Sequence, residues 1–173
     1  RLTVNYDDPA GDFGEFESVS VSALIVRSVK SGVLSGNETW EAAGSPYLVT
    51  GDVTVSSGAT LTLEAGAEVL FLADADDQDS GNVDYASELL IEGSLVIAGV
   101  AGDEQSGIVP NPVVLGSSAA APSLGDWGGI RVQGGYTTTD PMSSGASSVV
   151  DIEGLHLSHS AYGVQVQNAQ RVR

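Results

Sequence analysis

The chain has 173 residues, a length that favours one hydrophobic core with a small appendage. Its formal net charge is −17, which makes nucleic acid and anionic membrane surfaces poor partners and favours divalent cations or a basic partner. Cysteine is absent, so disulfides and thiolate metal sites are excluded, and no apolar run is long enough to span a bilayer. We therefore expect no membrane insertion.

Glycine is frequent, with 22 residues, and aromatic side chains make up only 6% of the chain. This composition favours a turn-rich β architecture over a helix bundle. The sequence starts with Arg1 and stops at Arg173 within a patterned segment. We expect a processed chain or an internal piece of a larger protein.

Residues 1–30 contain two stretches of alternating apolar and polar side chains, separated by an acidic turn. The alternation predicts a β-hairpin, which either caps the following domain or belongs to a preceding sandwich. Residues 18–26 carry no charge, so as an exposed edge they would pair with another chain. Residues 27–39 are predicted to be a connector, and the first unit is placed at 1–38.

From Tyr47 onward, short apolar pairs recur at close to eight-residue spacing, with glycine-containing turns between them. Three such strands separated by corners form one coil of a triangular solenoid, and longer loops at 73–87, 101–111 and 134–148 are inserted at corners. The pattern predicts a parallel β-helix of about three coils over 39–173, truncated or continued beyond the C-terminus. The residues expected to be buried and stacked are Val53, Val55, Leu61, Leu63, Val69, Phe71, Leu89 and Ile91.

Residues 44–71, GSPYLVTGDVTVSSGATLTLEAGAEVLF, and the corner Trp127-Gly128-Gly129-Ile130 resemble the right-handed parallel β-helix repeat proteins exported by many bacteria. The resemblance implies an all-β fold and an extracellular or cell-surface location. Such domains occur in adhesins, in large surface proteins and beside carbohydrate-active modules, so the fold alone does not choose a function.

Two functions remain open on these grounds. The first is a non-catalytic extracellular scaffold for surface adhesion, or a subunit of a larger surface assembly or filament, with self-association through residues 18–26 or through open coil ends. The second is a carbohydrate-binding or polysaccharide-degrading module. A glycan or cell-surface partner fits either function. The aromatic candidates for stacking on a sugar are Trp40, Tyr47, Tyr85, Trp127, Tyr136 and Tyr162, and Tyr85 and Tyr136 are the better ones because they lie in inserted loops.

Catalytic residues are hard to find in the sequence. Residues 31–130 contain no Lys or Arg, and Arg131 is interpreted as a surface charge beside acidic strands. His156 and His159 are the only histidines, and they could hold a metal only with a third ligand such as Asp151 or Glu153. We therefore expect no catalytic site.

The acidic loop 73–88 is the strongest site candidate. Oxygen-bearing side chains recur in it at the spacing of a calcium-binding loop, with Gly81 at the turn, although Ser87 stands where a bidentate acidic ligand is expected and Glu88 comes one residue late. The alternative is a solvated acidic loop. The predicted Ca²⁺ ligands are Asp74, Asp76, Asp77, Gln78, Asp79, Ser80 and Asp84.

Overall fold

The computed structural model describes residues 28–76, 81, 83, 85–133, 148–167, 169 and 171–173, and the backbone of 2–3 and 20–21. Regular structure in these residues is β-strand apart from one short 3-10 turn, η1 (Ala42–Gly44). The strands are β1 (Leu2–Thr3), β2 (Ser20–Val21), β3 (Ser28–Leu34), β4 (Glu38–Trp40), β5 (Tyr47–Val55), β6 (Thr60–Glu64), β7 (Glu68–Phe71), β8 (Glu88–Ile91), β9 (Ser94–Ala98), β10 (Val113–Ser117), β11 (Gly129–Gln133), β12 (Val149–Glu153), β13 (Leu155–Leu157), β14 (Val164–Gln167) and β15 (Arg171–Val172).

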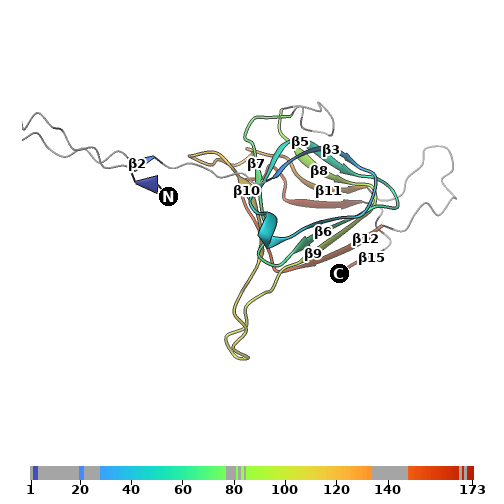
Figure 1. The fold of residues 1–173 in the computed structure, drawn as a ribbon. Coiled ribbons are helices and arrows are strands. Elements are labelled where there is room, and N and C mark those ends of the chain that lie inside the picture. The colour runs from blue at the N-terminus through green and yellow to red at the C-terminus, as the bar shows by residue number, and fades with distance from the viewer. Residues whose placement is uncertain are drawn as a thin grey trace, which may run out of the picture.

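From β3 onward the strands form a parallel β-helix with three faces (Figure 1). Face A contains the first halves of β3 and β5 with β7, β10 and β13, and face B contains their second halves with β8, β11 and β14. Face C contains β4, β6, β9, β12 and β15. All of these pairings are parallel, which confirms the predicted fold class.

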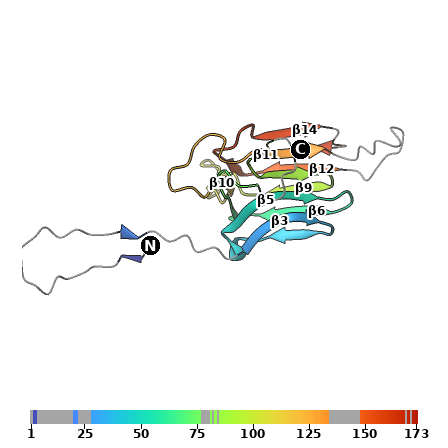
Figure 2. The same ribbon diagram turned by 90° about the horizontal axis from the view of Figure 1, so that it is seen from above.

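The rungs stack in register along the helix (Figure 2). On face B, Val33 pairs with Thr54, Thr54 with Leu90, Leu90 with Arg131, and Arg131 with Gln165. Face B therefore has five rungs, where the apolar pairs predicted about three coils. One of the additional rungs is the first, formed by β3 and β4, which lie almost entirely in the segment that the sequence assigned to a connector.

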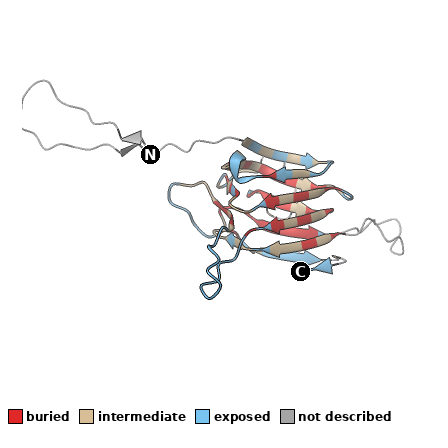
Figure 3. Cartoon of the chain, turned by 60° about the horizontal axis from the view of Figure 1, so that its bottom comes forward, coloured by how far each residue is buried: buried red, intermediate tan, exposed pale blue. Residues whose placement is uncertain are grey.

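The core is a set of aliphatic ladders between the three faces (Figure 3). Side chains alternate along each strand, so every second residue points inward and packs on the equivalent residue of the next rung. Trp127 stacks on Phe71 with ring centroids 3.9 Å apart, and Trp40 stacks on Tyr47 at 5.2 Å. All eight residues expected in the core are fully buried, which confirms the predicted inward pattern.

The N-terminal segment is described only in part. β1 and β2 pair antiparallel, with Leu2 opposite Val21 and Thr3 opposite Ser20, as a hairpin requires. Most of the uncharged stretch 18–26 lies outside the described residues, and self-association through it stays a prediction. In the described residues no helix has the length and apolar character needed to cross a membrane.

Candidate functional site: the polar corner between faces A and B

Polar side chains from successive rungs gather where the chain turns from face A to face B. Asp52 lies in the middle of β5, Glu88 begins β8, Arg131 lies on β11, and Tyr162 precedes β14. Arg131 occupies an outward position, because its register partners Leu90 and Gln165 stand on the outer side of face B. We call Asp52, Glu88, Arg131 and Tyr162 the polar corner.

An ion pair lies at the centre of the polar corner. Arg131 Nη2 donates to Glu88 Oε1 at 2.9 Å, and the two side chains are only 3% and 0% exposed. The same nitrogen lies 3.4 Å from the Tyr162 hydroxyl, and the guanidinium carbon lies 5.6 Å from the centroid of the Tyr162 ring. Arg131 is therefore held by a carboxylate and an aromatic ring from neighbouring rungs.

Backbone groups tie the polar corner to the acidic loop. The Glu88 N–H donates to Asp52 Oδ1 at 2.6 Å, and the Asp52 N–H donates to Asp76 Oδ1 at 3.4 Å. At the neck of the loop, the Ser87 N–H donates to the Ala75 carbonyl at 3.0 Å. These bonds connect Asp76 of the loop to the rungs that carry Asp52 and Glu88.

Two glycines leave the space that Glu88 occupies. A Cβ atom on Gly81 would lie 1.9 Å from Glu88 Oε2, and one on Gly128 would lie 2.5 Å from Glu88 Cγ. Gly81 also has a φ of +82°, a conformation that L side chains rarely adopt. The backbone therefore closes over the Glu88 carboxylate, from the loop at Gly81 and from the next rung at Gly128.

This arrangement is suited to holding structure and poorly suited to catalysis on a large substrate. A base or acid must come within hydrogen-bonding distance of the substrate atom, and Arg131 is almost completely covered. Its Nε is a buried donor without a hydrogen-bond partner in the described part of the chain, a cost that the Glu88 contact offsets. The interpretation of Arg131 as a surface charge was wrong.

Sequence reasoning missed the partners of Arg131 because they are distant in sequence. Glu88 precedes it by a full coil, 43 residues. The register Gly129 to Glu88 brings these positions together, and it can be read only once the lengths of the loops between rungs are known. The corner Trp127-Gly128-Gly129-Ile130 was the available signal of this contact in the sequence, because Gly128 packs against Glu88.

The predicted calcium ligands are only partly described. Asp74 is exposed with a φ of +52°, and Asp76 is partly buried and accepts the Asp52 N–H. Asp77, Gln78, Asp79, Ser80 and Asp84 lie outside the described residues. Within the described part, no group of three His, Cys, Asp or Glu residues could hold a metal ion. Calcium binding stays a prediction.

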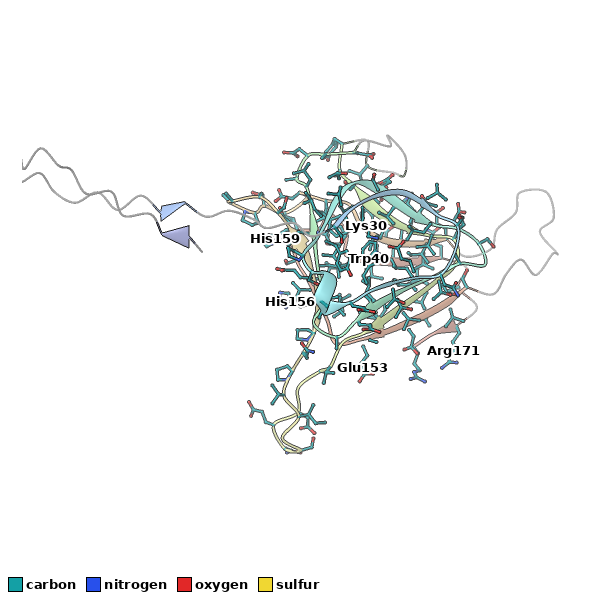
Figure 4. All side chains as sticks on the ribbon, in the orientation of Figure 1. Lys30, Trp40, Glu153, His156, His159 and Arg171 are labelled. Atoms are coloured by element: carbon teal, nitrogen blue, oxygen red, sulfur yellow. The ribbon has the colours of Figure 1, made fainter. Side chains whose placement is uncertain are left out.

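Both histidines lie along face A, His156 on β13 close to the corner with face C and His159 two residues beyond the end of β13 (Figure 4). His156 is exposed on β13, while its neighbours Leu155 and Leu157 pack against the core, as strand alternation predicts. Glu153 belongs to face C, on the far side of the corner at Gly154.

The pKa of Asp126, on the loop between β10 and β11, lies below its usual value. The main cause is a hydrogen bond from Ser117 to the Asp126 carboxylate, and a bond from the Ser123 N–H and the charge of nearby His159 act in the same direction, while burial acts against them.

The aromatic candidates for sugar stacking separate into two groups. Trp40, Trp127 and Tyr47 are buried in the core, so they are architectural. Tyr85 is 66% exposed at the end of the acidic loop, next to the polar corner. Tyr136 lies outside the described residues. Tyr85 is therefore the described aromatic side chain best placed to contact a ligand.

The stacked parallel rungs, the aliphatic ladders and the loops inserted at corners define a parallel β-helix protein. A family model described as a pectate-lyase-like β-helix domain matches residues 32–163, from the second half of β3 to the turn before β14. Because the match covers most of the chain, the chain belongs to this family of pectate-lyase-like β-helix domains. No curated protein and no solved structure shows significant similarity to it.

Proposed function

We propose that the chain is a non-catalytic extracellular scaffold, acting in surface adhesion or as a subunit of a larger surface assembly. The observation that carries this proposal is the closure of the polar corner, where Arg131 and Glu88 are paired and covered. Arg131 is also the only arginine between Arg27 and Arg171. A cation that is already paired with a carboxylate and shielded from solvent is poorly placed to act on a polysaccharide chain lying outside the helix.

The loops at the corners support a binding role for the scaffold. Residues 100–111 form a projecting hairpin, with antiparallel bridges between Val100 and Asn111 and between Asp103 and Ile108 (Figure 1). Val109 on this hairpin is largely exposed, as is Leu124 on the loop between β10 and β11. Loops positioned by a rigid scaffold are common sites of recognition.

The alternative is a carbohydrate-binding or polysaccharide-degrading module, which is favoured by the family match and by the exposure of Tyr85. The apolar face of an aromatic ring packs against the C–H groups of a sugar ring. The acidic loop beside Tyr85 would select neutral or cationic glycans, or acidic glycans bridged by calcium.

One experiment separates the two functions. The protein is incubated with polygalacturonate and with a panel of neutral and acidic glycans, with and without calcium, and both bound glycan and released oligosaccharides are measured. Absence of binding supports the scaffold, binding without product favours the carbohydrate-binding module, and depolymerised glycan overturns the non-catalytic proposal. In Tyr85→Ala, glycan affinity should fall if Tyr85 stacks on the sugar, while Val29→Ala, at an exposed position of β3 on face A, serves as the control.

Two further properties are proposed with this function. The acidic loop binds Ca²⁺ through Asp74, Asp76 and the neighbouring oxygen-bearing side chains, since a divalent cation would relieve the repulsion between carboxylates in so short a segment. Copies of the chain self-associate through exposed strand edges, since unpaired N–H and C=O groups favour pairing with another strand.

A further inference from the structure

We propose that Asn37 is an acceptor for an N-linked glycan. Asn37, Glu38 and Thr39 form an Asn-X-Thr sequence, the acceptor signal for this modification. The chain has five asparagines, and none of the other four is followed two positions later by Ser or Thr. A three-residue signal is weak alone, so the place of Asn37 in the fold decides whether it can act.

The signal lies in an exposed turn of the first rung. Residues 35–37 connect β3 to β4 at the corner between faces B and C, and all three are exposed. A Cβ atom added to Gly36 would have no atom within 4 Å, which shows that the space around the turn is open. A transfer enzyme and a branched glycan can therefore approach Asn37 without displacing a neighbouring element.

The hydrogen bond that Asn37 makes to the next rung is compatible with modification. Its Oδ1 accepts the Thr60 N–H of the next rung at 3.0 Å. The sugar is attached at Nδ2, which leaves the carbonyl oxygen free to keep this bond. Thr39 is exposed on the outer side of face C, in register with Thr62, so the hydroxyl that completes the signal is also accessible.

The chemistry requires a sugar donor, which we name as an oligosaccharide carried on a polyprenyl phosphate or pyrophosphate. The Asn37 amide nitrogen forms a bond to the anomeric carbon of the first sugar, and the bond from that carbon to the phosphate oxygen breaks. The lipid phosphate leaves with the electron pair, and a general base of the transfer enzyme accepts the proton that the amide loses. No oxidation or reduction takes place.

A glycan at this turn would protect an open edge of the helix. β4 is the last strand in the order of face C, and among the described residues β3 pairs only with β5. The backbone groups on the outer side of both strands are a template for pairing with another chain. A bulky, hydrated glycan at Asn37 would hinder such pairing at this end of the helix, which leaves residues 18–26 and the opposite coil end for the self-association proposed above. In the cell this protection rests on the extracellular location proposed above.

The test is secretion of the full chain from a host that carries out N-glycosylation, followed by peptide mapping with mass spectrometry. We expect a glycan on the peptide that contains Asn37, and enzymatic removal of the glycan should leave aspartate at position 37. Thr39→Ala keeps Asn37 and its bond to Thr60 but removes the signal, so the glycan should be lost. Thr39→Ser is the matched control and should keep it.

Two results would overturn the inference: a folded, secreted wild-type chain with an unmodified Asn37, or a glycan that persists in Thr39→Ala. Where secretion is poor, the purified folded chain is incubated with the transfer enzyme and its lipid-linked donor, and the same comparison between Thr39→Ala and Thr39→Ser is made. This second assay does not depend on the location of the protein in the cell. An unmodified Asn37 there contradicts the acceptor site itself, while modification there supports it whatever the natural location is.

Discussion

Two ion pairs of the β-helix differ in how far they are buried, and therefore in how much they matter for stability. Lys30 and Glu38 pair at the open rim of the first rung, with side chains 23% and 30% exposed. Arg131 and Glu88 pair in the closed polar corner, with exposures of 3% and 0%. A pair at a rim is screened by water and contributes little to stability, whereas a buried charge left without its partner is strongly destabilising.

The rim pair occupies inward positions. Lys30 stands in register with Val49, and Glu38 with Leu61, and both of these partners belong to the core. The ammonium group also lies 5.4 Å from the centroid of the Trp40 ring, and Figure 4 shows Lys30 and Trp40 together inside the first rung. Inward charges at an edge discourage another strand from extending the sheet.

The largest expected effect comes from breaking the buried pair. Glu88→Ala leaves Arg131 buried without its carboxylate, so the free energy of unfolding should fall by about 3 to 5 kcal/mol. The measurement is chemical denaturation monitored by circular dichroism. The double variant Glu88→Ala, Arg131→Met is the control and should recover much of the loss, because no unpaired charge remains. Equal losses in the single and double variants would show that the pair itself is unimportant.

A comparable effect is expected in the core that supports both pairs. Leu63 is fully buried and pairs with Ile97 of the next rung. Leu63→Ala should lower the free energy of unfolding by about 2 to 5 kcal/mol, the range for removing a well-packed aliphatic side chain. Thr62→Ala, on the outer side of the same strand, is the matched control. A loss below about 0.5 kcal/mol in Leu63→Ala would contradict its place in the core.

Calcium is the next test, because Asp76 and Gly81 of the acidic loop lie against the polar corner. If the loop binds Ca²⁺ only in the folded state, a hundredfold excess over the dissociation constant stabilises the protein by about 2.7 kcal/mol. Thermal unfolding is compared in calcium and in chelator at fixed ionic strength. The double variant Asp76→Asn, Asp84→Asn should show no difference in unfolding temperature between calcium and chelator. If the wild type and the variant melt at the same temperature in both conditions, the loop does not bind calcium and is only a solvated loop.

The smallest change in stability is expected at the rim. Lys30→Met should alter the free energy of unfolding by at most about 1 kcal/mol, because the pair is partly exposed. The same variant should change self-association more clearly than stability, because Lys30 no longer places an inward charge at the edge of β3. Sedimentation velocity should show more self-association than in the wild type. A variant that stays monomeric at the highest concentration tested would argue against the guarding role of Lys30.

The sequence predicted the fold well and the polar corner poorly. Apolar pairs at Val53, Leu61 and Val69 recur at a spacing that the register of the rungs confirms. The first rung was not predicted because the charged residues Lys30 and Glu38 take inward positions, where the repeat pattern expects aliphatic residues. Local pattern identifies strands, but it does not show which residues meet across coils of unequal length.

The polar corner illustrates this limit more clearly. The local sequence places Glu88 one residue beyond a calcium-binding loop and indicates a surface charge at Arg131. Their contact depends on the pairing of β8 with β11, and on the small size of Gly81 and Gly128. Neither condition can be recognised from residues near either partner in the sequence.

The polar corner is closed, and we propose that Arg131 serves structure and does not act on a substrate. This proposal is tested by modification of the native protein with an arginine-specific dicarbonyl reagent, with the modified sites mapped by mass spectrometry. Arg171 and Arg173 are exposed at the end of the helix and act as internal controls (Figure 4). We predict that they react while Arg131 stays protected until the protein is unfolded. Reaction of Arg131 in the folded protein at the rate of Arg171 would contradict the claim and reopen the case for catalysis.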